Sequence, residues 1–417
     1  MFSRVKGTRD LLDLSLYNFI VTQAKKQLQK YNFIEIATPI LEPIDLFKRS
    51  LGLHTDVVGK EMFTLEVGAE DKKETIVLRP EATASTVRAF IEAGIDQVPW
   101  KVFSVGPMFR HERPQKGRYR QFHQINMEII GAASISQDAH FIKMLDRLFK
   151  DHLSLKDYAL VINFLGCPED RKKYREKLYA FLEKKSAKLC ATCLERKDAN
   201  IMRVFDCKNP ACQELYQKAP YIAAHLCVGC NTEWQQLQDA LQILSVSYVY
   251  SPTLVRGLDY YNKTVFEFSS ADLGAQTAFC GGGRYDQLVT MLGGKVDQPS
   301  IGAAIGIDRV MMLLENNADL LSNAQQEALY AVIPLSDAQH QTALVIADML
   351  ARFGFKVDIL LDGSIKSMMR KANKLGAKAA LVIGQDEQEV NEVTVKNMIT
   401  SDQQRIKQTD LVAYLKQ

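Results

Sequence analysis

The sequence lacks any apolar run near the roughly 18 residues that a membrane span requires. Its first ten residues, Met1 to Asp10, lack the apolar core of a secretory signal peptide. Charge of one sign is not in excess either, since 52 Lys and Arg stand against 49 Asp and Glu. We therefore expect a cytoplasmic protein that does not bind membranes, in which any basic surface for a polyanion is local.

Motifs typical of nucleotide-binding loops are also missing. The sequence has no G-x-x-x-x-G-K-[ST], and the glycine runs at 281–283 and 302–306 do not match the spacing G-x-G-x-x-G. The sets H-E-x-x-H, G-x-S-x-G and H-R-D do not occur. If the chain binds a phosphate group, arginine side chains must hold it.

The composition is that of an ordinary globular protein. Its 417 residues are 47% hydrophobic and 24% charged, which is enough material for about two to four domains. Strand-like text dominates from residue 33 to 131, with one amphipathic stretch at 82–93, and this favours an antiparallel sheet over a doubly wound one. The expected strands are Phe33–Leu41, Thr75–Glu81, Lys101–Phe109 and Tyr119–Ile130.

A helical pattern interrupts the strands between about residues 167 and 245. Strands are expected again at Tyr248–Val255 and Thr264–Ser269, so the helical part is interpreted as an insertion into a sheet domain. After the polar stretch 315–326, strands and helices alternate, which predicts a separate α/β domain at 327–417. Its expected elements are a strand at 329–335, a helix at 337–352, a strand at 355–361, a helix at 365–375 and a strand at 379–383.

The strongest local signal is the segment from Phe109 to Gln124, interpreted as a strand, a loop and a returning strand. Residues 110–120 contain five cations and one carboxylate, and arginine forks match phosphate oxygens well. The alternative is a solvated basic hairpin.

The returning strand has a period of two. Phe122, Gln124, Asn126 and Glu128 share one face, while Ile125, Met127 and Ile129 share the other. A solvent-exposed sheet face would explain the polar side, but Phe122 on it better fits the floor of a cleft where a base could stack.

Four other segments carry polar groups in unusual places. Arg79 to Thr83 ends a strand, and alone it is an ordinary strand-to-helix cap. Leu254–Phe268 is expected to form a hairpin with Arg, Asp and paired Tyr at its turn, and Gly281–Asp286 to end a strand where a ligand could approach the backbone. Arg309 falls in the first turn of a helix, where a cation is mildly unfavourable.

Six of the eight cysteines lie between Cys190 and Cys230. The pairs Cys190-x-x-Cys193 and Cys227-x-x-Cys230 have the spacing of a tetrahedral zinc site, with Cys207 and Cys212 between them. The alternative is a group of reduced thiols in a helical insertion. The metal stays open at this point, and we expect any zinc to be structural.

These segments resemble the class II aminoacyl-tRNA synthetases and, among them, the histidyl-tRNA synthetase family. Arg256–Tyr261 and Gly282–Asp286 resemble two segments peculiar to the histidine enzymes, and their order makes the similarity specific. The similarity covers nearly the whole chain and also rests on Lys6–Asp10, on Thr38–Pro39 as motif 1, on Phe109–Glu128 as motif 2 and on Gly302–Arg309 as motif 3.

The resemblance implies an α+β fold. Residues 1–326 would form the class II catalytic domain, an antiparallel sheet flanked by helices that carries the mainly helical, cysteine-containing insertion at about 167–245. Residues 327–417 would form an anticodon-binding α/β domain. The implied activity is the ligation of L-histidine to tRNA(His) with ATP and Mg²⁺, in a homodimer with an interface around Phe33–Leu41.

The resemblance also implies roles for single residues. Arg110 and Arg256 would be catalytic at the α-phosphate and would lie beside the histidine. ATP would be bound by Arg110, Glu112, Phe122 and Arg309. Histidine would be bound by Glu81, Thr83, Arg110, Gln124, Glu128, Arg256, Tyr260, Tyr261 and Tyr285. The acceptor end of tRNA would meet Gln115, Lys116, Arg118 and Arg120.

In the final domain, five cations lie at or near helical spacing: Lys366, Arg370, Lys371, Lys374 and Lys378. A solvated helix face is the plain interpretation, whereas the resemblance makes this domain the anticodon binder. Two rival functions remain. One is the regulatory subunit of ATP phosphoribosyltransferase, which shares the fold but generally lacks the last domain and the Arg256 segment. The other is an RNA-binding module whose nucleotide site has decayed.

Overall fold

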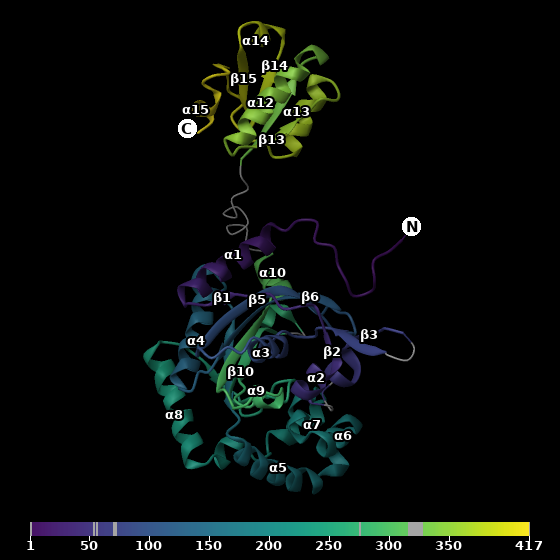
Figure 1. Ribbon diagram of the computed structural model, residues 1–417, viewed down its shortest axis with the longest axis vertical. Helices are drawn as coiled ribbons and strands as arrows, with labels where there is room; N and C mark the ends of the chain where they lie inside the picture. The colour runs from purple at the N-terminus through teal and green to yellow at the C-terminus, as the bar shows by residue number, and fades with distance from the viewer. Residues whose placement is uncertain are drawn as a thin grey trace. The chain divides into compact units, whose positions relative to one another are not determined.

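The computed structural model describes residues 2–52, 55, 57–69, 73–274, 277–315 and 328–416. The chain divides into two compact units, Met1–Ala318 and Asp319–Gln417. The boundary expected between 326 and 327 lies outside the described residues. Each unit contains its own sheet (Figure 1).

Within the described residues, an eight-stranded sheet has the order β1-β5-β6-β11-β10-β9-β7-β8. The inner pairs, from β5 to β7, are all antiparallel, as predicted. The edge pairs β1–β5 and β7–β8 are parallel, so the sheet as a whole is mixed. The strands are β1 Ile34–Glu35, β5 Trp100–Phe109, β6 Gln121–Ile130, β7 Ala159–Phe164, β8 Val249–Tyr250, β9 Asn262–Ser269, β10 Ala278–Arg284 and β11 Ser300–Gly306.

Aromatic side chains pack the short helical segment Leu148–His152 against this sheet. The ring of Phe149 lies 4.9 Å from that of Phe268 on β9 and 4.9 Å from that of Phe279 on β10. Such edge-to-face contacts add to the burial of apolar area. The helices of this unit outside the insertion are α1 Ser15–Lys30, α2 Ile44–Leu51, α3 Thr83–Glu92, α4 Ser136–Arg147, α9 Leu288–Met291 and α10 Ile307–Leu314, with the short turns η1 Val57–Glu61, η2 Leu148–His152 and η6 Ala271–Leu273.

The single strand predicted at Phe33–Leu41 is wrong. β1 covers only Ile34–Glu35, and the chain then moves to β2 (Leu41–Pro43), at one edge of a small sheet of order β2-β4-β3. Pro39 has no N–H to donate, and Arg79 Nη1 donates to the carbonyl oxygen of Thr38 at 2.9 Å. This backbone is therefore held by a side chain instead of a strand. The other two strands of the small sheet are β3 Phe63–Val67 and β4 Glu74–Leu78.

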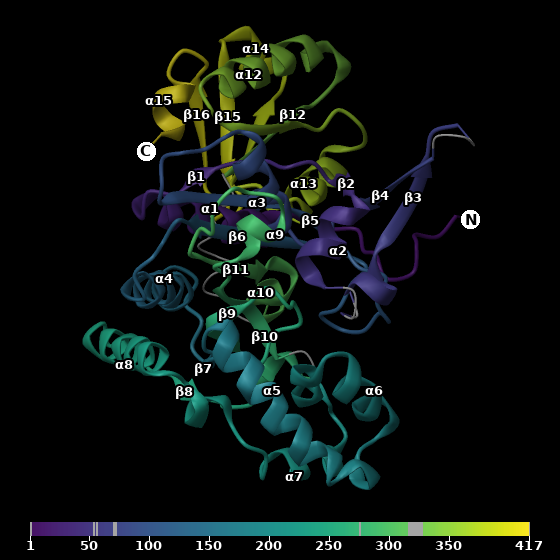
Figure 2. The ribbon, with the colours of Figure 1, turned by 60° about the horizontal axis from the view of Figure 1, so that its bottom comes forward.

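The insertion between β7 and β8 is helical, and both views place its helices α5, α6 and α7 together at one end of the unit (Figure 2). Its apolar residues from Tyr174 to Ile222 belong to one continuous core with α2, α3 and the tyrosines that precede β9. Its elements are α5 Pro168–Glu183, η3 Ser186–Lys188, α6 Ala191–Ala199, η4 Ile201–Asp206, α7 Pro210–Tyr216, η5 Ile222–His225 and α8 Val228–Ile243.

Two predictions after the insertion are wrong. The strand expected at 248–255 is reduced to Val249–Tyr250, because Pro252 follows within two residues and the Asn163 amide binds the carbonyl oxygens of Pro252 and Leu254. The hairpin expected at 254–268 is instead an irregular segment up to Tyr261, followed by β9.

The second unit contains a five-stranded sheet among its described residues, in the order β13-β12-β14-β15-β16. The first three strands are parallel and lie where the alternating pattern predicts them, whereas β15 and β16 are antiparallel and were not predicted. The elements are β12 Leu329–Pro334, η7 Asp337–Gln339, α12 His340–Arg352, β13 Lys356–Ile359, α13 Ile365–Lys374, β14 Ala379–Ile383, α14 Gln385–Glu389, β15 Glu392–Asn397, β16 Gln403–Lys407 and α15 Leu411–Leu415. In the described part of the chain, no helix has the length and apolarity needed to span a membrane.

Candidate active site

A buried glutamate lies at the centre of the polar side of the main sheet. Glu128 on β6 is 2% exposed and accepts hydrogen bonds from Thr83 Oγ1 at 2.8 Å and from the Tyr285 hydroxyl at 2.5 Å. Burial raises the pKa of Glu128 to about 8, although the two hydrogen bonds act in the opposite direction. A ligand with an N–H donor would stabilise the charged form of this carboxylate.

Glycines make room for this carboxylate and for a nearby guanidinium. Gly302 on β11 is paired with Glu128, and a Cβ at position 302 would overlap the Glu128 carboxylate. Gly281 on β10 is covered in the same way by the guanidinium of Arg256. The glycines of β10 and β11 therefore clear space for side chains that reach across the sheet.

A second buried carboxylate belongs to Glu81, just before α3. Its two oxygens accept the backbone N–H groups of Thr83 at 2.7 Å and of Ala84 at 2.9 Å. The cap anticipated for this segment is therefore present, while the Thr83 side chain points to Glu128. Burial is the main cause that raises the pKa of Glu81, with the two backbone N–H groups opposing it.

Three buried tyrosines lie beside these carboxylates. The Tyr260 ring lies 4.6 Å from that of Tyr261 and 5.7 Å from that of Tyr285, and all three are buried. Burial raises the pKa of Tyr261 to about 12, so its hydroxyl stays neutral near pH 7. The Tyr261 ring covers Gly283, where a Cβ would approach it to 2.8 Å.

The polar face predicted for β6 also contains unsatisfied groups. Gln124 Oε1 and Asn126 Nδ2 are buried without a hydrogen-bond partner among the described residues. On the opposite face, Ile125, Met127 and Ile129 are fully packed, at 0%, 0% and 1% exposure. Because buried polar atoms are normally paired, these unpaired groups on β6 indicate a place for a polar ligand.

Three arginines from distant parts of the chain converge near this pocket. Burial lowers the pKa of Arg309 to about 10, and the charges of Arg110, Arg118 and Arg256 lower it further. Burial likewise lowers the pKa of Arg110, and the charge of Arg256 lowers it further. Cations that destabilise one another in this way favour a bound anion.

Each arginine of the cluster has fixed partners. Arg110 Nε donates to the carbonyl oxygen of Pro80 at 2.9 Å, and its guanidinium lies 5.5 Å from the centre of the Phe122 ring. Arg309 Nε donates to the carbonyl oxygen of Gly117 at 2.9 Å and Nη1 to that of Ala278. Phe122 thus has a cation over its ring where the sequence predicts a base.

Arg256 pairs with Glu267 on β9, a residue that the sequence reasoning missed. The Arg256 Nε atom is buried without a partner among the described residues. A single carboxylate in the apolar strand Thr264–Ser269 was the available signal. Asp308 was missed as well, and it binds Arg9 and the backbone N–H of His123, the latter at 2.7 Å. It thereby ties the N-terminal segment to β6 and α10.

The basic loop between β5 and β6 divides into exposed and engaged residues. Gln115 and Lys116 are exposed. Arg118 forms ion pairs with Glu112 and, at 3.5 Å, with Glu61, so Glu112 is paired within its own loop. Arg120 donates to the carbonyl oxygens of Glu112 and Lys6, both at 3.3 Å. Arg118 and Arg120 therefore stabilise the conformation of the loop.

The cysteine set expected for zinc is wrong. The structure places Cys190 and Cys193 with Cys207 and Cys212, whereas Cys227 and Cys230 lie with Cys167 and Asp170. The two C-x-x-C pairs, at the starts of α6 and α8, therefore belong to two different groups of possible ligands.

Comparisons with known proteins give matches along nearly the whole chain. The family model described as histidyl-tRNA synthetase matches residues 9–310, and the anticodon binding domain matches residues 330–417. The histidine–tRNA ligase of Clostridioides difficile is 40% identical and that of Aquifex aeolicus 42%, over 99% and 98% of this chain and 98% and 99% of theirs.

Solved structures show the same similarity. The crystal structure of apo Staphylococcus aureus histidyl-tRNA synthetase matches with a TM-score of 0.82 and 33% identity over 100% of both chains. A Bacillus halodurans structure, titled as an ATP phosphoribosyltransferase regulatory subunit/histidyl-tRNA synthetase, matches in fold at 21% identity and a TM-score of 0.63, over 92% of this chain and 98% of that one. With one family model over residues 9–310 and full-length relatives at about 40% identity, the chain belongs to the histidyl-tRNA synthetase family.

Proposed function

We propose that this protein is a histidine–tRNA ligase. It activates L-histidine with ATP to histidyl-adenylate and pyrophosphate, and then transfers histidine to the 3′ end of tRNA(His). The proposal is carried by three arginines near the buried carboxylates. Arg110 Nε binds the carbonyl oxygen of Pro80, next to Glu81, and Arg256 lies over Gly281. Both of their charges lower the pKa of Arg309. An anionic, phosphate-bearing substrate next to an amino acid satisfies both parts of this site.

In the first step, a carboxylate oxygen of histidine attacks the α-phosphorus of ATP, the bond to the β-phosphate breaks, and pyrophosphate leaves with the electron pair. Arg110 and Arg256 stabilise the charge at the α-phosphate, and Arg309 holds the far end of ATP. Phe122 stacks on adenine, and Glu112 contacts the nucleotide. The unpartnered Arg256 Nε is an unused donor that supports this role.

The carboxylate pocket recognises the amino acid. Glu81, Thr83 and Gln124 bind the amino group, and the unpartnered Gln124 Oε1 supports this assignment. Glu128 and Tyr261 read the imidazole, with Tyr260 and Tyr285 beside them. A pocket of hydrogen-bonding groups rejects apolar analogues, because these leave its own buried groups unpaired.

Magnesium is expected to accompany ATP. Glu267 pairs with Arg256, and its charge also acts on Arg309, so it is one carboxylate among the phosphate-binding arginines. Oxygen ligands of this kind suit Mg²⁺, which neutralises charge on the leaving pyrophosphate.

The transfer step needs tRNA. The exposed Gln115 and Lys116, with Arg118 and Arg120 at the base of their loop, approach its acceptor end. In the second unit, α13 carries the exposed cations Lys366, Arg370, Lys371 and Lys374, with Lys378 shortly after it. Among the described residues, none of these five forms an ion pair within the chain, as expected for a surface that binds the anticodon stem or loop.

We also propose a cytoplasmic homodimer. The segment around β1 and β2 exposes apolar side chains, with Ile34 at 62%, Ile40 at 40% and Leu41 at 49%. Three large aliphatic groups in one short stretch support an interface there. Sedimentation of the wild-type chain and of an Ile34→Lys variant tests it: a dimer that the variant weakens is expected, and a monomeric wild type at micromolar concentration contradicts it.

The decisive experiment is amino-acid-dependent exchange between ATP and pyrophosphate, run with each of the twenty amino acids. Exchange with histidine alone is expected. Histidine binding in calorimetry without exchange would instead favour the regulatory paralogue, whose fold is similar. RNA binding without either property would favour the decayed RNA-binding module.

A further inference from the structure

Four cysteine sulfurs meet inside the insertion, although they come from separate segments. Cys190 and Cys193 begin α6, Cys207 follows η4, and Cys212 lies in the first turn of α7. Their Sγ atoms all lie within 4.8 Å of one another. Cys193, Cys207 and Cys212 are buried, at 0%, 7% and 0% exposure. All four are free thiols in the structure.

The spacing of the sulfurs is that of a metal site and not of a disulfide. Cys190 Sγ and Cys207 Sγ lie 3.8 Å apart. Ligands about 2.3 Å from a tetrahedral zinc ion lie about 3.8 Å from one another, whereas bonded sulfurs are about 2.05 Å apart. This separation, with all four sulfurs within 4.8 Å of one another, is what four ligands of one ion would show.

Backbone N–H groups point at two of these sulfurs. The N–H of Cys190 donates to Cys212 Sγ and that of Asn209 to Cys207 Sγ, both at 3.4 Å. Thiols are weak hydrogen-bond donors, so four neutral thiols stabilise one another little. Thiolates bound to a cation accept N–H hydrogen bonds, which stabilise their negative charge.

We propose that Cys190, Cys193, Cys207 and Cys212 bind one structural Zn²⁺ ion. Four thiolates in a tetrahedral arrangement favour zinc, and four protein ligands leave no position open for catalysis. On binding, each thiol releases its proton and forms one Zn–S bond, with no change of oxidation state.

The second group of possible ligands is explained without a metal. Asp170 accepts the backbone N–H of Cys227 at 2.9 Å and that of Cys167 at 3.4 Å, so its carboxylate joins the starts of α5 and α8. Cys227 is exposed. We assign no ion to this group, and its cysteines provide matched controls.

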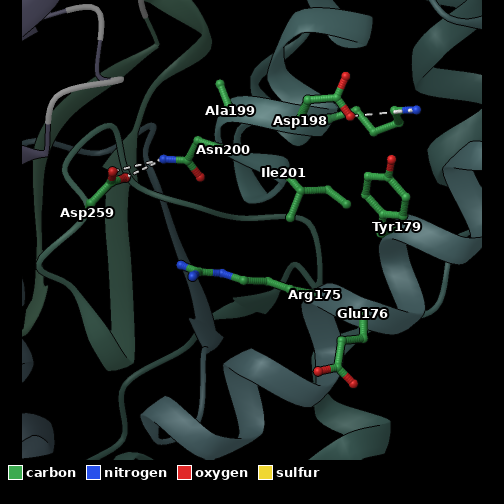
Figure 3. Close-up of a pocket in the computed structure, with 9 residues that line it drawn as sticks. Arg175, Glu176, Tyr179, Asp198, Ala199, Asn200, Ile201 and Asp259 are labelled. Atoms are coloured by element: carbon green, nitrogen blue, oxygen red, sulfur yellow. Dashed lines mark hydrogen bonds and ion pairs between the residues drawn. The ribbon is translucent and has the colours of Figure 1, made fainter.

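The proposed zinc site supports the segment that leads into the pocket. η4 lies between Cys193 and Cys207, and Arg203 Nη1 near its centre donates to the carbonyl oxygen of Gly257 at 3.2 Å. Asn200 Nδ2, just before η4, donates to both carboxylate oxygens of Asp259, at 2.7 and 2.9 Å (Figure 3). Both contacts hold the chain between Arg256 and Tyr260. This positioning role rests on the proposed function, whereas the metal site does not.

Metal analysis of the full chain, purified without chelator, tests the site. About one zinc per chain is expected in the wild type and in Cys230→Ser, and less than a tenth of that in Cys212→Ser. Absence of zinc, iron in its place, or zinc lost in Cys230→Ser but kept in Cys212→Ser would each overturn the assignment.

If Cys212→Ser does not fold, the wild-type chain still decides. After removal of zinc, Co²⁺ is added as the probe. Strong absorption from thiolate-to-cobalt charge transfer together with tetrahedral d–d bands, both abolished by one equivalent of Zn²⁺, is expected, and a spectrum of octahedral Co²⁺ contradicts the site.

Exchange assays then separate the two proposals. Zinc-free protein is expected to show a raised KM for histidine, which added Zn²⁺ restores. Unchanged kinetics would remove the positioning role while leaving the metal site in place. A zinc-loaded wild type without exchange would instead remove the proposed function.

Discussion

The hydroxyl of Tyr285, which follows β10, donates a hydrogen bond of 2.5 Å to Oε2 of Glu128 on β6. β11, which carries Gly302, lies between β10 and β6 in the sheet. The pair joins two strands that are not neighbours in the sheet. The carboxylate can occupy this position because Gly302, which pairs with Glu128, has no side chain to overlap it.

Glu128→Ala is expected to raise the KM for histidine about 10- to 100-fold and to leave the KM for ATP nearly unchanged, since it removes a buried hydrogen-bonding group. Exchange kinetics with each substrate varied in turn measure this. Glu42→Ala is the control, because Glu42 is also buried, at 3% exposure, but pairs with Arg88 on α3. Equal effects of Glu128→Ala on both KM values would contradict the assignment.

Stability should depend on pH through Glu128. Because folding raises its pKa from about 4.5 to about 8, the folded state binds this proton more tightly than the unfolded state. This contribution is fully present below pH 4.5 and is lost as the pH rises toward 8. Glu128→Gln cannot titrate, so its free energy of unfolding relative to wild type should increase across that window. Urea unfolding at pH 5, 6, 7 and 8 tests this, and a constant difference would contradict it.

Gly302→Ala should abolish histidine-dependent exchange, because the new Cβ would overlap the Glu128 carboxylate. Loss of histidine binding in calorimetry is the measurement. Gly306→Ala in the same strand is the control for folding, since its Cβ would meet the Phe279 carbonyl oxygen at an ordinary 3.6 Å. A Gly302→Ala protein that binds histidine normally would show that the carboxylate can move aside.

Arg256→Lys should lower the kcat of exchange about 100- to 1000-fold, because an ammonium group cannot form the two-pronged contacts of a guanidinium at a phosphate. Steady-state exchange at saturating substrates measures the loss. The control is Arg88→Lys on α3. Arg88 also binds a carboxylate, that of Glu42, through two nitrogens, and this substitution should leave kcat within twofold of the wild-type value. Similar losses in both variants would indicate a general effect on folding.

Reversal of two charges on α13, Lys366→Glu with Arg370→Glu, should raise the KM for tRNA at least tenfold without changing ATP–pyrophosphate exchange. Aminoacylation and exchange assays on the same preparation measure both steps. Arg352→Glu on α12 is the control, because this exposed arginine already pairs with Asp348 at 2.7 Å. Impaired exchange in the double variant would contradict a role confined to tRNA.

Local patterns predicted the parts of the site that depend on one strand. The period of two in β6 placed Gln124, Asn126 and Glu128 on one face, because side-chain direction alternates along any strand. The break in Phe33–Leu41 has one local signal, Pro39, which cannot donate to a strand. Its other cause could not be predicted, since Arg79, about forty residues away, takes the carbonyl oxygen of Thr38.

The cysteine clusters show the same limit. The spacing in the sequence suggested one site made of the two C-x-x-C pairs. The fold of η4 and α7 instead brings Cys207 and Cys212 to Cys190 and Cys193. Glu267 was also missed, because its importance comes from its ion pair with Arg256, whose guanidinium lies over Gly281 on the neighbouring strand. Contacts between segments distant in sequence leave little trace in one sequence.

Glu81 holds the first N–H groups of α3, and Thr83, in that same first turn, contacts Glu128. Helix ends fray before helix interiors as a protein is warmed. A weakened cap at Glu81 would therefore release Thr83 while the sheet stays folded. On warming of the wild-type protein, discrimination among amino acids should therefore be lost before the sheet melts, in a temperature range that this cap sets.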